Sequence, residues 1–216
     1  MHIVVAGGHG KIAMLLHPIL RERGHTVRAL IRNPDHAEEV RQAGADPVVC
    51  DIEQVDDISE AVGKADAVVF AAGAGPGSGA ARKLTMDRDG ATKLIAAAKK
   101  NGIPRYVMIS AMGADRPRPD AGDVFKVYLI AKAEADRAVR ESGLDYTILR
   151  PGGLTDDAPT GRIALAPELP RGQIPRADVA TAVAESLELP ATIGKQWELV
   201  SGETSIREAL ERGEGA

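Results

Sequence analysis

The sequence predicts a single domain of the α/β class, with helices on both faces of a doubly wound parallel sheet. Short apolar runs rich in β-branched residues alternate with segments whose apolar residues recur at helical spacing. The connections between the runs are long enough to hold a helix, which is typical of parallel neighbours rather than hairpins. The 216 residues suit one domain with its own core, and no linker or internal repeat divides residues 1–216.

The predicted elements alternate along the chain. The first strand covers residues 3–6, and the helix after it begins at Lys11 and ends before Gly24. Further strands are expected at residues 25–31, 46–50, 65–72, 105–110, 144–149 and 197–200, and further helices at residues 34–43, 52–62, 85–101, 124–142 and 176–189, followed by a short polar helix. The sheet should therefore have about seven strands. Residues 152–175 form a long connection rich in proline and glycine.

Composition argues against several classes of protein. A formal net charge of -4 and 3% aromatic residues do not suit a nucleic-acid partner, which favours a basic surface and stacking rings. Cys50 is the only cysteine, so an intrachain disulfide is excluded and a small core residue is expected. All five histidines lie within the first 36 residues without metal-ligand spacing, so no metal site is predicted. A strand at the start of the chain and the lack of a long apolar run predict no signal peptide, no membrane contact and a cytoplasmic location.

A glycine turn joins the first strand to the first helix. Strand, turn and helix follow one another closely, which presents free backbone N–H groups and a positive helix end to a pyrophosphate. Gly7 permits the tight turn, Gly10 lets the phosphates approach, and Ala13 lets the helix pack closely on the strand. We therefore predict a dinucleotide site rather than a plain glycine-rich turn. Its predicted cofactor-binding residues are Gly7, Gly8, His9, Gly10, Lys11 and Ile12.

The end of the second strand usually decides which dinucleotide binds. An acid there bonds the ribose 2′-hydroxyl, whereas an arginine accepts a 2′-phosphate. This chain has Arg32 at that place, which favours NADP over NAD, although a plain solvated arginine is the alternative. Lys11 and Arg28 are candidates for additional positive charge. Asp51, followed by Ile52, either bonds the adenine amino group or caps the next helix.

The fourth strand ends in Ala71, Ala72 and Gly73, which are expected beside the cofactor. Residues 73–79 read Gly-Ala-Gly-Pro-Gly-Ser-Gly. Such a run is either a surface connection or a flexible segment over the cofactor phosphates, and the sequence leaves both open.

Tyr128 and Lys132 are four residues apart on a predicted helix. Positions i and i+4 share one helix face, so both side chains can enter one cleft. A lysine ammonium near a tyrosine hydroxyl lowers the pKa of that hydroxyl towards the range of a general acid or base. The alternative is an exposed pair on an amphipathic helix.

Taken together, these segments resemble the short-chain dehydrogenase/reductase superfamily, specifically its small atypical members with an extended, epimerase-type glycine motif. The matching segments are GGHGKIA, the run DRDGA that starts at Asp87, RYVMIS, YLIAK, LDYTILRPGG and IPRADVA. The resemblance implies a Rossmann fold with a seven-stranded parallel sheet and NAD(P) along the carboxyl ends of the strands. It also implies a catalytic Tyr128 and a Lys132 that binds the nicotinamide ribose. The residues implied beside the nicotinamide are Pro151, Gly152, Gly153 and Leu154.

Two positions depart from the family pattern. Asp87, which together with Ser110 joins Tyr128 and Lys132 as a catalytic candidate, stands where the extended branch commonly has asparagine, as in many atypical relatives. The catalytic serine is usually the second residue of a pair that reads Ser110-Ala111 here. Its hydroxyl is therefore missing unless Ser110 substitutes, which the alternation of side chains along a strand makes doubtful.

The expected function is NADP(H)-dependent hydride transfer to or from a small carbonyl substrate, with Tyr128 as acid/base. The pocket on the substrate side should come from residues 152–175 and the C-terminal segment. The alternatives are a non-catalytic NADP sensor or scaffold, a sugar-nucleotide epimerase or dehydratase, and a flavin or quinone reductase. A homodimer through the helices that carry Asp87 and Tyr128 is also possible, because Val127, Leu129 and Ile130 are apolar there, although core packing explains them equally well.

Overall fold

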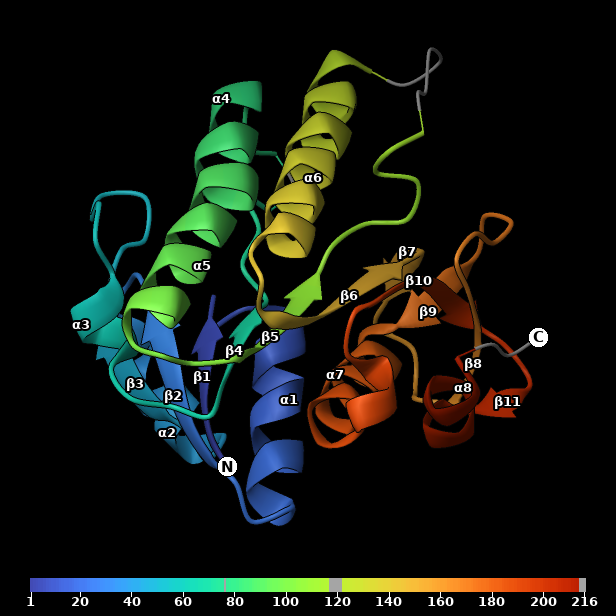
Figure 1. The fold of residues 1–216 in the computed structure, drawn as a ribbon, viewed down its shortest axis with the longest axis horizontal. Coiled ribbons are helices and arrows are strands. Elements are labelled where there is room, and N and C mark those ends of the chain that lie inside the picture. The colour runs from blue at the N-terminus through green and yellow to red at the C-terminus, as the bar shows by residue number, and fades with distance from the viewer. Residues whose placement is uncertain (76, 117–121, 214–216) are drawn as a thin grey trace.

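The computed structural model describes residues 1–75, 77–116 and 122–213. Seven parallel strands form the main part of one sheet, in the order β3-β2-β1-β4-β5-β6-β10 (Figure 1). They are β1 (His2–Ala6), β2 (Thr26–Ile31), β3 (Asp46–Val49), β4 (Ala67–Phe70), β5 (Arg105–Ile109), β6 (Asp145–Pro151) and β10 (Lys195–Ser201). The predicted α/β class and the seven predicted strands are thus confirmed. Cys50, directly after β3, is buried.

The sheet is larger than predicted, because two antiparallel strands extend it beyond β10. β8 (Arg162–Ala166) pairs with β10, and β11 (Thr204–Ser205) pairs with β8, which makes nine strands in the described sheet. β7 (Gly153–Thr155) and β9 (Gln173–Pro175) form a separate parallel pair. The Pro- and Gly-rich connection of residues 152–175 thus contains three short strands. Short strands whose pairing depends on a distant edge leave little local signal in the sequence.

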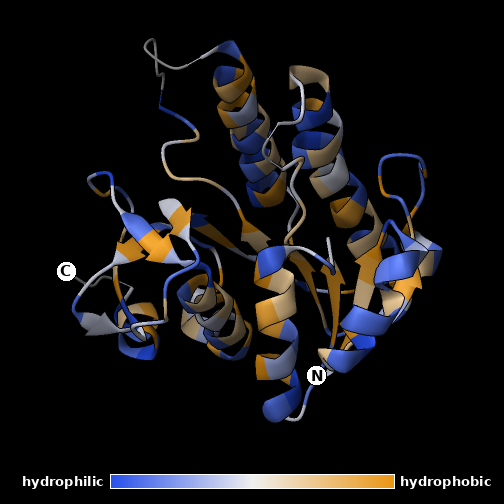
Figure 2. Ribbon diagram, turned by 180° about the vertical axis from the view of Figure 1, so that it is seen from behind, coloured by the Kyte–Doolittle hydropathy of each residue, from blue (hydrophilic) through white to orange (hydrophobic). Residues whose placement is uncertain are grey.

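Helices cover both faces of the sheet. α1 (Lys11–Glu22), α2 (Ala37–Gln42), α7 (Arg176–Glu188) and α8 (Ile206–Arg212) pack with one set of strand side chains, which includes Ile3 and Val5. α3 (Ser59–Val62), α5 (Gly90–Lys100) and α6 (Asp123–Glu141) pack with the other set, which includes Val4 and Ala6. Figure 2 shows the central strands as mostly hydrophobic, between helices of mixed hydropathy. Neighbouring β1 residues therefore enter opposite cores, as the period-2 pattern requires. No helix in the described ranges is long and apolar enough to cross a membrane.

Two predicted helices have different bounds. In place of a helix over residues 52–62, only Ser59–Val62 is helical, because Asp51 and Asp57 each accept a hydrogen bond from the backbone N–H two residues on and form turns instead. The predicted helix 85–101 begins earlier, with α4 (Ala80–Arg82), and continues through the π-helical segment η2 (Lys83–Asp89) into α5. Short 3₁₀ turns, η1 (Pro34–His36) and η3 (Pro190–Thr192), precede α2 and β10.

The glycine turn lies against the neighbouring strand β2. The Gly8 N–H donates a hydrogen bond to the Leu30 carbonyl over 2.9 Å, and the ring Nε2 of buried His17 lies 2.7 Å from the Gly8 carbonyl oxygen. A Cβ on Gly8 would lie 2.5 Å from the Cβ of Ala29. Gly8 is therefore required for close packing between turn and sheet.

Gly8→Ala should destabilise the fold by about 1 to 3 kcal/mol, because the added methyl group overpacks the contact with Ala29. Gly79→Ala is the matched control, since a Cβ there meets nothing within 4 Å, and its effect should stay within about 0.5 kcal/mol. Urea unfolding of both variants measures the difference. Equal midpoints for the two variants would contradict the packing role of Gly8.

Candidate functional site

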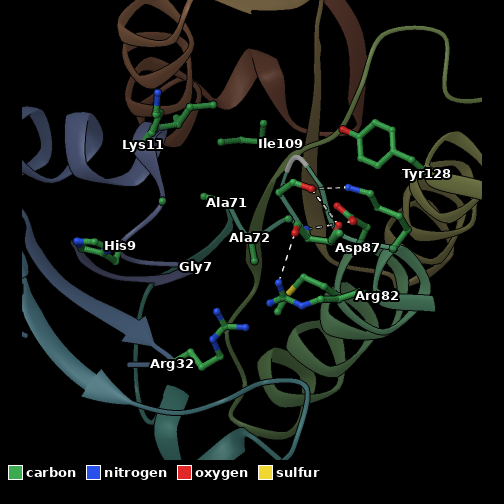
Figure 3. A pocket seen from close by; sticks show the side chains of 18 of the residues that line it. Gly7, His9, Lys11, Arg32, Ala71, Ala72, Arg82, Asp87, Ile109 and Tyr128 are labelled. Atoms are coloured by element: carbon green, nitrogen blue, oxygen red, sulfur yellow. Dashed lines mark hydrogen bonds between the residues drawn. The ribbon is translucent and has the colours of Figure 1, made fainter. Parts of the chain in front are cut away.

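A pocket of about 870 Å³ lies at the carboxyl ends of the parallel strands, where Figure 3 shows its labelled side chains. Among the predicted site residues, those that line it are Gly7, His9, Gly10, Lys11, Ile12, Arg32, Ala71, Ala72, Gly73, Asp87, Ser110, Tyr128, Lys132 and Leu154. The loop after β4 borders the same pocket through Gly73, Ala74, Gly75, Gly77 and Ser78. The described residues of this loop therefore border the pocket, which is compatible with a segment over the cofactor.

Six predicted cofactor residues lie outside the lining of this pocket: Gly8, Asp51, Ile52, Pro151, Gly152 and Gly153. The Asp51 carboxylate accepts a hydrogen bond from the Glu53 N–H and so closes a turn, but it caps no helix, because the next helix begins at Ser59. The Gly152 and Gly153 N–H groups donate to the Leu199 and Gly172 carbonyls, so this segment is bound to its neighbours. Of the four residues implied beside the nicotinamide, only Leu154 lines the pocket.

One end of the pocket has two arginines that share a carboxylate. Arg32 Nη1 lies 3.7 Å from Glu53 Oε2, and Arg82 Nη2 lies 2.8 Å from the same oxygen. The Arg32 side chain is 56% exposed, and both arginines line the pocket. Arg28, which the sequence suggested as a further charge, instead donates to the Val62 carbonyl. The additional positive charge at this end therefore comes from Arg82.

The start of α1 is open to an anion. Helix α1 has no side-chain cap and no acidic residue in its first turn, so its first N–H groups and positive dipole end remain available. Arg32 lies at one side of this helix start, and Tyr128 lies across the pocket (Figure 3). This arrangement fits a dinucleotide whose diphosphate lies at α1. In the described part of the chain, no group of three or more His, Cys, Asp or Glu side chains is placed to hold a metal ion.

Tyr128 and Lys132 both reach the other end of the pocket from α6, as the i, i+4 spacing predicts. The Lys132 ammonium is buried, lies 3.2 Å from Asp87 Oδ1 and donates to the Ile109 carbonyl over 3.2 Å. It lies 5.9 Å from the centre of the Tyr128 ring. Asp87 also accepts a hydrogen bond from the Ala74 N–H. Asp87 thus connects the lysine to the loop after β4.

Electrostatics at Tyr128 differ from the expectation. Burial raises the pKa of its hydroxyl, and although Lys132 lowers that pKa, the net shift is upward. Burial also opposes the charge on Lys132, yet Tyr128 and Asp87 hold the lysine pKa above its ordinary value. The prediction that the lysine brings the tyrosine pKa down towards neutrality is therefore wrong for this arrangement. Tyr128 remains protonated at neutral pH.

Ser110 faces a buried acid rather than standing free. Its hydroxyl donates to Asp136 Oδ2 over 2.8 Å, and the same oxygen accepts from Arg150 Nε over 2.8 Å. Arg150 Nη1 then binds Asp115, in the loop after β5, over 2.9 Å. Burial raises the pKa of Asp136, while Arg150 and Ser110 oppose that rise. The Ser110 hydrogen is thus donated to Asp136 and is not available to a substrate oxygen.

Sequence reasoning missed Arg82, Asp136, Arg150 and Arg176 as parts of this site or its support. Asp136 had a usable signal, since it follows Lys132 by four residues on the same helix face. Arg82 and Arg150 had none, because their partners Glu53 and Asp136 come from other elements. Leu129 on α6 is buried in the protein's own core, while Ile130 is 53% exposed.

Comparison with known proteins agrees with this geometry. The sequence pattern of the NAD(P)H-binding family matches residues 7–190. A Bacillus subtilis protein named "Uncharacterized sugar epimerase YhfK" is 37% identical over 98% of this chain and 100% of its own. The structure of a putative NAD-dependent epimerase/dehydratase from Bacillus halodurans is 40% identical, with a TM-score of 0.92 over 98% of this chain and 99% of its own. The oxidoreductase ylbE from Lactococcus lactis is 30% identical, with a TM-score of 0.87 over 98% and 96%.

Arg150→Met should destabilise the protein by about 3 to 5 kcal/mol at pH 7, because it leaves a buried, ionised Asp136 without its cation. The loss of stability caused by Arg150→Met should be smaller at pH 5. Removing Arg150 raises the Asp136 pKa further, so a larger fraction of Asp136 is protonated at pH 5 than at pH 7. Chemical denaturation at both pH values measures this.

The matched control for that substitution is Arg140→Met on α6, where the exposed guanidinium binds Gln196. It should change stability by no more than about 0.5 kcal/mol. A destabilisation by Arg150→Met that is equal at both pH values would show that the Asp136 charge is not the cause.

Proposed function

Since the chain belongs to the NAD(P)H-binding family, we propose that it is an NADP(H)-dependent oxidoreductase that transfers a hydride to or from a small carbonyl compound. The observation that carries this proposal is the convergence of an uncapped α1 start, Arg32 and the Tyr128/Lys132 pair on one pocket. Each group alone is common in proteins. Together they provide for the diphosphate, the 2′-phosphate and the reacting end of one extended ligand.

The preference for NADP rests on the two arginines at Glu53. A 2′-phosphate carries up to two negative charges, and Arg32 has an exposed guanidinium that is only 3.7 Å from its present partner. Arg82 donates twice to that same carboxylate. Glu53 thereby offsets one of the two positive charges and leaves one for the phosphate. No acid takes the place of Arg32 to bind a ribose 2′-hydroxyl.

In the proposed chemistry, Tyr128 donates a proton to the carbonyl oxygen of the substrate. The raised pKa keeps this hydroxyl protonated at neutral pH, which suits reduction better than oxidation. NADPH, when bound, supplies the hydride. Lys132 stabilises the negative charge that develops on the tyrosine oxygen, and Asp87 holds its ammonium in place.

A second candidate is reduction of a flavin or quinone, an acceptor that needs no proton from the protein. The contact that favours it is the hydrogen bond from the Ser110 hydroxyl to Asp136. Because Ala111 has no hydroxyl either, Tyr128 is left as the principal proton donor, and an acceptor that needs no proton from the protein avoids this shortage. The name of the Bacillus subtilis relative raises sugar epimerisation instead. Here, however, β8, β10 and β11 complete the sheet and α7 and α8 cover it, so the C-terminal part adds to the core rather than forming a separate lobe.

NADPH should bind at least about tenfold more tightly than NADH, because a charge-assisted contact to the 2′-phosphate contributes about 1.5 to 3 kcal/mol. Arg32→Ala should remove most of this preference. Arg41→Ala is the matched control, because Arg41 is an equally exposed arginine whose partner is Glu38, on its own helix. Fluorescence titration with both cofactors decides, and a preference that survives Arg32→Ala would refute the assignment.

Tyr128→Phe should retain cofactor affinity and lower turnover of a carbonyl substrate by about 10² to 10⁴, as expected for loss of a general acid. Reduction by the parent protein should not decline between pH 7 and pH 9, because the protonated donor persists below its raised pKa. Tyr146→Phe, on β6 outside the pocket, is the control. Unchanged turnover in Tyr128→Phe would favour the flavin or quinone alternative, and a panel of aldehydes, ketones, quinones and flavins measured with NADPH tests it.

A further inference from the structure

Two cations that line the pocket share one carboxylate. Lys11 Nζ lies 2.8 Å from Asp156 Oδ2, and Arg176 Nη1 lies 2.6 Å from Asp156 Oδ1. Lys11 and Arg176 both line the pocket. The proposed function uses neither Arg176 nor Asp156.

The fold brings these residues together. Lys11 is the first residue of α1 and Arg176 is the first residue of α7, and the two helices lie side by side on one face of the sheet (Figure 1). Their first side chains therefore meet at the same end of the molecule. Because both bind one carboxylate, the Arg176 guanidinium lies close to the Lys11 ammonium. Both side chains line the pocket that the start of α1 also borders, where a diphosphate is expected.

The segment that carries Asp156 is fixed to α7 as well. The Asp178 carboxylate is buried and accepts hydrogen bonds from the Thr160 N–H, the Thr160 hydroxyl and the Gly161 N–H. Asp178 follows Arg176 by two residues. The start of α7 therefore anchors residues 156–161 at both ends, which holds the Asp156 carboxylate beside Lys11 and Arg176.

The exposure of these groups indicates which contacts can exchange. The side chains of Lys11 and Asp156 are 69% and 63% exposed, and such surface pairs are weak and screened by salt. Arg176 is only 21% exposed, so it is held more firmly. A diphosphate, with more negative charge than one carboxylate, competes well for both cations, and arginine binds phosphate through two parallel hydrogen bonds.

We propose that Arg176 binds the diphosphate of the dinucleotide, and that Asp156 holds the guanidinium at this place until the diphosphate replaces the carboxylate. This inference rests on the cofactor-binding part of the proposed function. It needs neither the preference for NADP nor hydride transfer by Tyr128.

Arg176→Gln should weaken NADPH, NADH and ADP-ribose alike by about tenfold, because all three carry the diphosphate. Adenosine 2′-monophosphate, which lacks it, should bind as it does to the parent protein. Isothermal titration calorimetry measures all four ligands. Arg176→Lys should recover part of the lost affinity. Arg171→Gln should bind all four ligands as the parent does, because Arg171 is an exposed arginine just before α7 that does not line the pocket.

Asp156→Asn tests the replacement step. The amide keeps an acceptor oxygen but removes the competing charge, so ADP-ribose should bind at least as tightly as to the parent. A loss of ADP-ribose affinity as large as that of Arg176→Gln would overturn the proposal that the diphosphate replaces the Asp156 carboxylate. Parent-like affinity of Arg176→Gln for ADP-ribose, or an equal loss for adenosine 2′-monophosphate, would overturn the contact itself. If Arg176→Gln loses affinity for ADP-ribose as expected while the parent protein reduces no acceptor, the inference stands and the oxidoreductase proposal fails.

Discussion

The site depends on how closely the glycine turn approaches the sheet. A Cβ on Gly7 would lie 2.6 Å from the Cα of Ala72, and one on Gly8 would lie 2.5 Å from the Cβ of Ala29. These contacts fix the start of α1 between β2 and the loop after β4, at the point where the strand order reverses between β1 and β4. In open parallel sheets, such a switch point leaves a crevice at the carboxyl ends of the strands. The pocket and the orientation of α1 both follow from this packing.

Helix α6 provides the other fixed element, because Tyr128, Lys132 and Asp136 follow one another at intervals of four residues along one face. Each has a different environment. Tyr128 is at the pocket surface, Lys132 is buried against Asp87, and Asp136 is buried against Arg150. A single helical stripe thus contains the tyrosine proposed as proton donor, the cation beside it and an anchor for β6 and the loop after β5. The anchor engages Ser110, which explains physically why this serine is a poor replacement for the hydroxyl missing at Ala111.

Much of the fold could be predicted from the sequence, because the parallel strands are buried on both faces and each appears as a short apolar run. The glycine turn and the Tyr128/Lys132 spacing could also be predicted, because both are local patterns in the sequence. The strands β8 and β11 were not, because their pairing depends on the distant edge of β10. Likewise, Arg28 and Arg82 look alike in the sequence. Only the fold shows that Arg28 binds the Val62 carbonyl while Arg82 reaches the pocket. The upward pKa shift of Tyr128 depends on burial, which no spacing reveals.

The charges around the pocket follow one rule. Five of the cations that line it, Lys11, Arg32, Arg82, Lys132 and Arg176, each lie against a carboxylate, and burial decides how firmly that pair is held. Lys132 and Asp87 are almost fully buried, so separating them would leave an uncompensated charge, and the pair is a fixed part of the site. Lys11 and Asp156 are mostly exposed, and Arg32 lies 3.7 Å from Glu53 with over half its side chain in solvent. These contacts contribute little to stability and are easily exchanged for a phosphate. The Lys132–Asp87 pair is therefore in place before a ligand arrives, while the exposed ion pairs at the ends expected to hold phosphates can exchange partners.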